Sequence, residues 1–140
     1  MKQKLVDAST QAKRFETLRV AHQTETTEDY VELIADLLAA NGEARLVDLS
    51  RRFGVSHATA NKIIARLQKE GFVESQPYRS LFLTPEGLAL AQACKKRHNI
   101  VLQFLLHIGV SRENAETDAE GIEHHVSQET LAAFARFTTA

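Results

Sequence analysis

The sequence predicts a mainly α-helical protein, with an N-terminal winged helix-turn-helix domain followed by a second, helical domain. Three observations predict it. Apolar residues recur at helical spacing through most of the chain. Two short amphipathic segments flank the turn Gly54-Val55-Ser56. Two short strand-like runs come next, and a helix, a helix-turn-helix and a hairpin in this order are typical of a winged helix.

The N-terminal quarter of the chain contains one clear helix. Residues 1–25 carry mixed charge and a weak apolar stripe, so we interpret them as an N-terminal extension that is helical in part. A helix is predicted to begin with Thr26 or Thr27 as its N-cap, because acidic residues follow where the helix dipole favours them. The pair Asn41-Gly42 is typical of a helix end.

The middle of the chain supplies the rest of the winged helix. Residues 43–71 are predicted to form two short helices, the second with Ser56 as N-cap and with its end at Gly71. Residues 72–75 and 81–83 are predicted to be the two strands of the wing.

The remainder of the chain is predicted to be helical. Thr84 is a natural cap and Pro85 suits a first helical position, so a long helix is expected to run from there to Gly109. Further helices are expected over 111–125 and from 127 to the end. The predicted domains are the extension, residues 1–25; the winged helix, residues 26–88; and the second domain, residues 89–140.

The composition is that of an ordinary globular protein. Of 140 residues, 44% are hydrophobic and 25% are charged, which argues against global disorder. No apolar run approaches the roughly 20 residues that span a bilayer, and the N-terminus lacks the apolar stretch of a signal peptide. The single cysteine, Cys94, excludes an internal disulfide. We therefore expect a cytoplasmic protein that has no membrane partner.

The net charge of −1 conceals an uneven distribution along the chain. Residues 26–42 are acidic and contain no lysine or arginine, whereas residues 43–80 contain seven basic and four acidic residues. A basic middle between acidic flanks indicates one module for phosphate groups and another for cations.

The second helix of the helix-turn-helix is the predicted DNA-reading element, because such a helix enters the major groove. The candidate DNA-binding residues on this helix and on the wing are His57, Thr59, Asn61, Lys62 and Arg79. Asn61 and Thr59 can read bases, while Lys62 and Arg79 suit phosphate. The alternative is that the pattern reflects helix packing alone, with His57 as an ordinary surface residue.

Carboxylates and imidazoles recur at helical spacing in two segments. Glu120, Glu123 and His124 lie at i, i+3 and i+4, so one helix face would present two carboxylates and an imidazole. Asp29 and Glu32 are also three residues apart. Metal sites in helix bundles also combine a glutamate and a histidine about one turn apart on the same helix. Taken separately, an acidic pair on a helix is usually a solvated face.

His98 and Cys94 lie on the apolar stripe of the long helix. A buried imidazole is costly without a partner, so His98 is either a hydrogen-bonded core residue or a metal ligand. Cys94 lies one turn before His98. It is interpreted first as a small buried hydrophobe, and the alternative is a Zn²⁺ or Fe²⁺ ligand beside His98.

Several of these motifs together resemble one known family. They are Asp29-Tyr30-Val31-Glu32, the helix-turn-helix, the wing ending Leu81-Phe82-Leu83-Thr84, Arg97-His98, and above all Glu120-Gly121-Ile122-Glu123-His124-His125. The chain resembles the manganese-transport regulators of the diphtheria-toxin-repressor family from about residue 26 onward. Residues 1–25 fall outside the resemblance.

The resemblance implies a homodimeric transcriptional repressor rather than an enzyme. Its second domain would serve dimerisation and metal binding, and Mn²⁺ would be the co-repressor for binding palindromic, double-stranded operator DNA of manganese-transport genes. The metal ligands that it implies are Asp29, Glu32, His98, Glu120, Glu123 and His124. His125 also occurs beside the ligand histidine in manganese regulators, and we interpret it as a residue with a supporting or structural role.

The chemistry of this ligand set agrees with the resemblance. Four carboxylates and two imidazoles suit Mn²⁺, and four carboxylates balance two dications, so we expect two Mn²⁺ per subunit. Iron-responsive members resemble the chain but place Met at the position of Asp29 and Cys at that of Glu120, which favours manganese here.

Three other functions stay open at this point. One is an iron- or zinc-responsive repressor of the same fold. Another is a binuclear metal-dependent hydrolase, although the sequence shows no separate base, nucleophile or phosphate loop for a small-molecule substrate. The third is a metal-independent protein-interaction module with solvated acidic faces.

Overall fold

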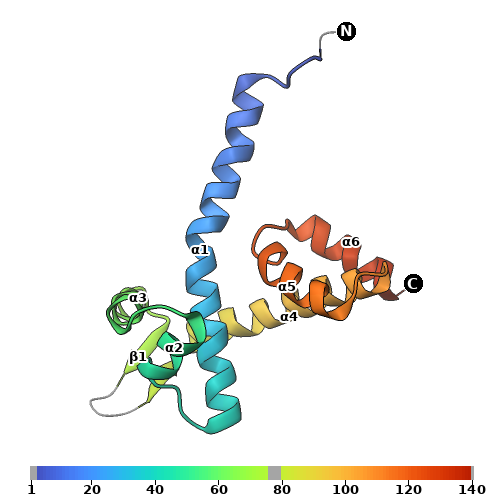
Figure 1. Cartoon of the computed structure of the whole chain (residues 1–140). Helices are drawn as coiled ribbons and strands as arrows, with labels where there is room; N and C mark the ends of the chain where they lie inside the picture. Colours follow the sequence, from blue (N-terminus) through green and yellow to red (C-terminus); the bar gives the residue numbers. More distant parts are fainter. Residues whose placement is uncertain (1–2, 76–79, 140) are drawn as a thin grey trace. The chain divides into compact units, whose positions relative to one another are not determined.

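The computed structural model of the chain describes residues 3–75 and 80–139. The chain divides into two compact units. One unit is Thr27–Ile100, and the other combines the residues before Thr27 with those from Val101 onward. Two long helices, α1 (Ala8–Asn41) and α4 (Pro85–His107), contribute residues to both units (Figure 1).

Helix α1 is continuous from Ala8, so the prediction that a helix begins at Thr26 or Thr27 is wrong. No Gly or Pro interrupts residues 8–41, and helix propensity therefore carries through both threonines. The true cap is Asp7, whose carboxylate accepts a hydrogen bond from the Thr10 amide at 3.1 Å. Hydrogen bonds from Ser9 and Thr10 lower the pKa of Asp7 to about 2. Helix α1 ends before Gly42, as predicted.

The unit Thr27–Ile100 contains the predicted winged helix. Helices α2 (Leu46–Phe53) and α3 (His57–Lys69) flank Gly54, which has the left-handed φ of 66° that the turn requires. The Ser56 hydroxyl accepts a hydrogen bond from the Thr59 amide at 3.0 Å, which confirms the predicted N-cap. Strands β1 (Val73–Ser75) and β2 (Leu81–Leu83) pair antiparallel, with Val73 opposite Leu83.

One hydrophobic core joins these elements to the C-terminal half of α1. Its buried members are Tyr30, Ile34, Leu37, Ala44, Leu49, Ile64, Leu67, Val73 and Leu81. Tyr30 also stacks on Phe53, with ring centroids 4.3 Å apart. The part of α1 that carries Asp29 and Glu32 is therefore held by the same core as α3.

Helix α4 begins as predicted. The Thr84 hydroxyl accepts a hydrogen bond from the Gly87 amide at 3.0 Å, and Pro85 is the first helical residue. A Cβ atom at position 87 would lie 2.1 Å from the carbonyl oxygen of Phe72. Gly87 thus allows the first turn of α4 to pass close to the wing.

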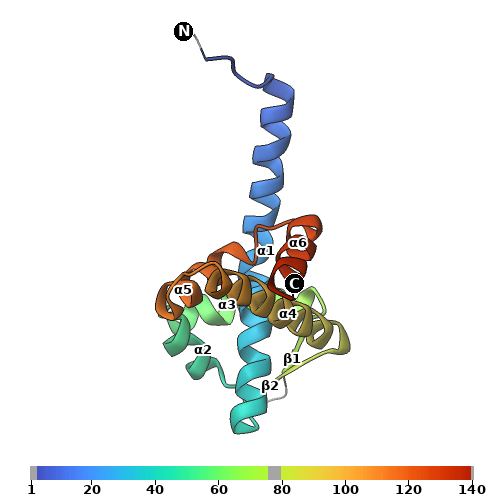
Figure 2. The same ribbon diagram turned by 90° about the vertical axis from the view of Figure 1, so that its right-hand side faces the viewer.

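The other unit is built around the end of α4, helix α5 (Arg112–Ile122) and helix α6 (Gln128–Thr139) (Figure 2). Phe104 stacks on Phe134 with ring centroids 4.0 Å apart, and it meets Phe137 edge-on. Helix α5 ends three residues earlier than predicted. The amide of His125 bonds to the Ile122 carbonyl at 2.9 Å, so the last turn tightens instead of continuing as α-helix.

No helix in residues 3–75 and 80–139 is both long enough and apolar enough to cross a bilayer.

Candidate functional site

Helix α3 presents a polar surface on the side opposite its core. Ala60, Ile64 and Leu67 are buried, whereas His57, Thr59, Asn61 and Lys62 are exposed. The amphipathic spacing therefore sends the predicted DNA-binding side chains of α3 toward solvent. The Thr59 hydroxyl accepts a hydrogen bond from Ser56 at 2.9 Å, so Thr59 supports the helix cap as well.

Two further exposed cations lie in the last turn of α2. Arg51 and Arg52 are exposed and, with Asp48, line a cavity of about 220 Å³. Both arginines belong to the basic segment 43–80, but the sequence pattern alone predicts no DNA contact for them. The sequence feature that could have pointed to them is the pair of basic residues in the last turn of α2, directly before the turn at Gly54. Arg79, predicted to contact phosphate, lies outside the described residues.

Acidic residues of α1 form a stripe that faces α4 within the unit Thr27–Ile100. Glu28, Glu32 and Asp36 are spaced four residues apart and therefore share one helix face. Asp36 pairs with Lys95 of α4. The hydrogen bond to Asp36, together with the charges of Asp36 and Glu32, raises the pKa of Lys95. Glu32 is half-buried, and so is Asp29, which follows Glu28 in the sequence.

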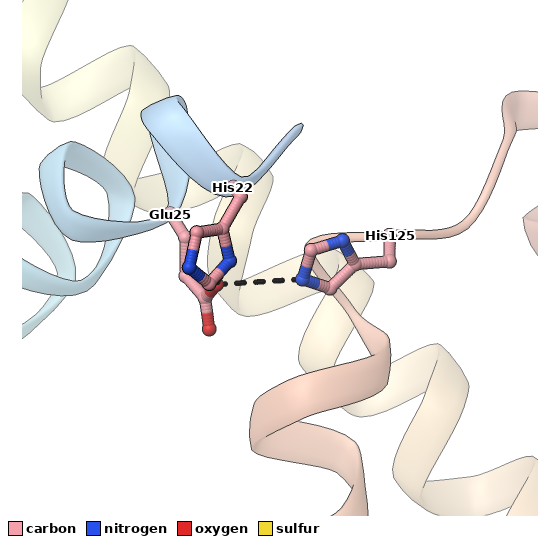
Figure 3. Close-up of side chains that lie close together, drawn as sticks. All are labelled: His22, Glu25 and His125. Carbon is pink, nitrogen blue, oxygen red and sulfur yellow. Dashed lines mark hydrogen bonds and ion pairs between the residues drawn. The ribbon is translucent and has the colours of Figure 1, made fainter. Parts of the chain in front are cut away.

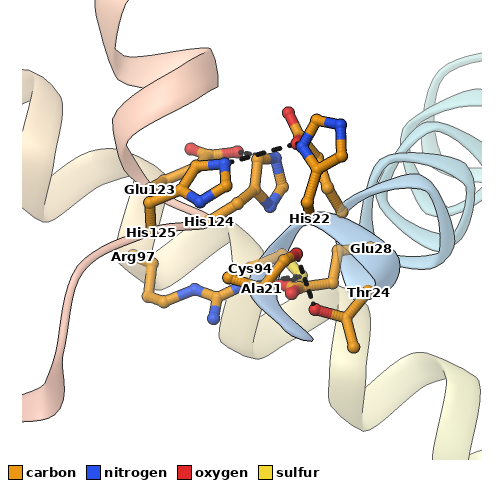
Figure 4. Close-up of polar contacts among 10 residues, drawn as sticks. Ala21, His22, Thr24, Glu28, Cys94, Arg97, Glu123, His124 and His125 are labelled. Carbon is orange, nitrogen blue, oxygen red and sulfur yellow. Dashed lines mark hydrogen bonds and ion pairs between the residues drawn. The ribbon is translucent and has the colours of Figure 1, made fainter. Parts of the chain in front are cut away.

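The most buried ion pair of this stripe joins Glu28 of α1 to Arg97 of α4. The Cys94 thiol donates to Glu28 at 3.3 Å, and its sulfur accepts from the Arg97 guanidinium at 3.4 Å (Figure 4). Cys94 is fully buried. These contacts favour the structural interpretation of Cys94 over its role as a ligand beside His98, which is half-buried one turn later.

The end of α5 places three predicted ligands in the other unit. Glu120 is exposed in the last turn of α5, while Glu123 and His124 follow directly in the tightened turn. The backbone of Glu123 keeps helical angles and its amide bonds to the Ala119 carbonyl at 3.0 Å. The predicted i, i+3 relation of Glu120 and Glu123 is thus retained beyond the end of the regular helix.

Glu123 and His124 are polar residues whose side chains are buried, which is uncommon in a protein. Glu123 is 0% exposed and His124 is 6% exposed, and His124 Nε2 lies 3.4 Å from Glu123 Oε1 (Figure 4). A buried carboxylate beside a buried imidazole is costly unless partners compensate it. This pair fits a metal-binding role, since carboxylate oxygen and imidazole nitrogen are both ligands of divalent transition metals.

The six predicted ligands are therefore divided equally. Asp29 and Glu32 of α1 and His98 of α4 belong to one unit. Glu120, Glu123 and His124 belong to the other. Asp29 and Glu32 lie one turn apart on α1, and Glu120, Glu123 and His124 lie within five consecutive residues at the end of α5.

Two family descriptions together match most of the chain from residue 22 onward. Residues 22–81 match "Iron dependent repressor, N-terminal DNA binding domain". Residues 84–139 match "Iron dependent repressor, metal binding and dimerisation domain". The chain belongs to the iron-dependent repressor family. The predicted fold class is confirmed: a DNA-binding domain precedes a helical metal-binding and dimerisation domain.

Named relatives of the chain include transcriptional regulators called MntR. Transcriptional regulator MntR of Salmonella typhimurium is 53% identical over 134 residues, which are 96% of this chain and 85% of that protein. The HTH-type transcriptional regulator MntR of Geobacillus kaustophilus is 40% identical over 104 residues, 74% of each chain.

Solved structures of the family share the fold. IdeR of T. acidophilum superposes with a TM-score of 0.73 at 27% identity, over 81% of this chain and 54% of that one. A manganese-dependent transcriptional repressor in complex with manganese superposes with a TM-score of 0.74 at 27% identity, over 81% of this chain and 52% of that one. The chain spans about half the length of these two structures.

Proposed function

We propose that the chain is a manganese-responsive transcriptional repressor that binds operator DNA as a cytoplasmic homodimer. The observation that carries the proposal is the ligand set, four carboxylates and two imidazoles, with Asp29 and Glu120 where iron-responsive members place Met and Cys. Relatives named MntR at 53% identity support the same metal. Two Mn²⁺ per subunit would balance the four carboxylates.

The proposed ligands are Asp29, Glu32, His98, Glu120, Glu123 and His124. Bound Mn²⁺ would supply the positive charge that lets these carboxylates lie close together. Asp29 and Glu32 sit on the segment of α1 that shares a core with α3, so their positions are coupled to the DNA-reading helix. The coupling is reciprocal: operator DNA must raise metal affinity by the factor by which metal raises DNA affinity.

The function requires that two copies of α3 reach successive major grooves. A symmetric dimer reads a palindromic operator when its recognition helices are spaced by about one DNA turn, roughly 34–36 Å. We propose residues 26–88 as the DNA-binding module and 89–140 as the dimerisation module, with manganese-transport genes as targets. The chain acts by binding DNA, and the proposal includes neither a substrate nor a membrane partner.

Fluorescence anisotropy with operator-like DNA tests this function. We expect tight binding with Mn²⁺, weaker binding with Fe²⁺ or Zn²⁺ at equal free concentration, and little binding in a chelator. Equal binding under all conditions would contradict the metal response. Stronger stimulation by Fe²⁺ or Zn²⁺ than by Mn²⁺ would replace manganese with that metal.

Substitutions on α3 should separate base reading from phosphate contact. Asn61→Ala is expected to cost about 1–3 kcal/mol of operator affinity and to relax specificity at one base position, because Asn pairs with adenine in the major groove. Lys62→Ala should weaken binding to all sequences and lower the slope of log affinity against log salt by about 1. Anisotropy on operator and unrelated DNA measures both effects.

Lys69→Ala is the matched control for these variants. Lys69 is an exposed lysine in the last turn of α3, two turns away from Lys62. It should change the salt slope less than Lys62→Ala does. An Asn61→Ala protein with unchanged discrimination between operator and unrelated DNA would remove Asn61 from the base-reading set.

A further inference from the structure

A second group of potential ligands lies away from the six proposed above. His22 and Glu25 occupy one turn of α1, and His125 follows the end of α5 (Figure 3). All three belong to the same unit. They offer two imidazole nitrogens and one carboxylate oxygen, and these ligand atoms all lie within 4.8 Å of one another.

One carboxylate oxygen connects both imidazoles. Glu25 Oε2 lies 3.2 Å from His22 Nδ1 and 3.4 Å from His125 Nε2. Bonds of about 2.0–2.1 Å in a tetrahedral site place neighbouring ligand atoms roughly 3.3 Å apart. Two of the three distances between ligand atoms in this group therefore already match those around a tetrahedrally coordinated cation.

The two imidazole rings lie next to one another in a loosely stacked arrangement. Their centroids are 6.1 Å apart and their planes differ by 29°. His22 is 80% exposed and His125 is 30% exposed, so water can complete the coordination sphere. Both histidines also line a groove of about 570 Å³, to which Phe15 and Leu18 contribute apolar surface.

We propose that His22, Glu25 and His125 bind one divalent transition-metal cation, with Zn²⁺ preferred to Mn²⁺. Two nitrogens and one oxygen make a softer set than the carboxylate-rich ligands of the proposed co-repressor site, and nitrogen ligands bind Zn²⁺ more tightly than Mn²⁺. The site goes beyond the proposed function, because it shares no ligand with the six residues given there.

The site joins two segments that are 100 residues apart in sequence. His22 and Glu25 lie on α1, at the start of the residues matched as DNA binding, and His125 belongs to the residues matched as metal binding and dimerisation. A cation held by all three would fix the N-terminal half of α1 to this domain. Arg14 and Arg19 are exposed in that half of the helix, so trypsin can report on its order.

Native mass spectrometry of the full chain, titrated with Zn²⁺, tests the proposal. The variants are His22→Ala, Glu123→Ala and the double substitution. His22→Ala should bind one Zn²⁺ fewer than the wild type. Glu123→Ala should still bind the Zn²⁺ ion held by His22, Glu25 and His125. The double variant should bind one Zn²⁺ fewer than Glu123→Ala alone. Gln23→Ala, an exposed neighbour on α1, should retain the wild-type count.

Trypsin digestion supplies a readout independent of stoichiometry. Zn²⁺ should slow cleavage at Arg14 and Arg19 in the wild type and in Gln23→Ala, but not in His22→Ala. A His22→Ala protein that binds as many Zn²⁺ ions as the wild type overturns the proposal. Operator binding distinguishes the two functions: His22→Ala should retain Mn²⁺-stimulated DNA binding even where it loses the Zn²⁺ ion.

Discussion

Replacing Glu123 with alanine should abolish the stimulation of operator binding by Mn²⁺. Glu123 is fully buried beside His124 at the end of α5, so it is the carboxylate of the proposed set that is best shielded from water. Coupling between an effector and a ligand is typically 1–3 kcal/mol, or about 5- to 150-fold in affinity. The variant is expected to lose this whole factor while its metal-free DNA affinity stays unchanged.

Anisotropy titrations with and without Mn²⁺ measure the effect. Glu113→Ala is the matched control, because Glu113 is an exposed glutamate in the first turn of the same helix. It should keep full stimulation. Glu123→Gln preserves side-chain size and removes the charge, so it separates loss of a ligand from loss of packing. Wild-type stimulation in both Glu123 variants would contradict the proposed ligand set.

The fold was predictable wherever its signals are local. Gly54 and Ser56 specify the turn and the cap of α3, and Thr84 with Pro85 specifies the start of α4. Each of these signals acts over a few residues, through backbone angles or a single side-chain hydrogen bond. The structure confirms all of them.

The start of α1 was missed because a threonine acts as an N-cap only where the residues before it are not helical. Thr26 and Thr27 precede acidic residues and look like caps, but no helix breaker separates them from the residues before them. In the structure the Thr27 hydroxyl instead accepts a hydrogen bond from Arg66 of α3 at 3.4 Å. Such a contact, 39 residues away in sequence, cannot be read from local pattern.

In the candidate site, too, local spacing was predictable and contacts between helices were not. Spacing along one helix was enough to pair Asp29 with Glu32 and Glu120 with Glu123. The partnership of Glu28, Cys94 and Arg97 depends on how α1 packs against α4, and the sequence contains no local trace of it. The group formed by His22, Glu25 and His125 was missed for the same reason.

Replacing Arg97 with alanine should destabilise the unit Thr27–Ile100 by about 3 kcal/mol. The Glu28 side chain is only 9% exposed, and removing one partner of a buried ion pair typically costs about 3–5 kcal/mol. The lower figure applies because the Arg97 side chain is 24% exposed. The loss corresponds to a change on the order of a hundredfold in the folding equilibrium. Urea unfolding in a chelator, followed by circular dichroism, measures it without bound metal.

Lys95→Ala provides the comparison on the same helix. Lys95 and Asp36 are both about half exposed, and exposed ion pairs contribute roughly 0–1 kcal/mol, so this variant should unfold near the wild-type midpoint. Adding Glu28→Gln to Arg97→Ala removes the buried charge and should restore part of the lost stability. Equal, small effects of Arg97→Ala and Lys95→Ala would show that the Glu28–Arg97 pair behaves as an exposed one. A large loss confined to Arg97→Ala would identify this pair as the main electrostatic contact between α1 and α4 in that unit.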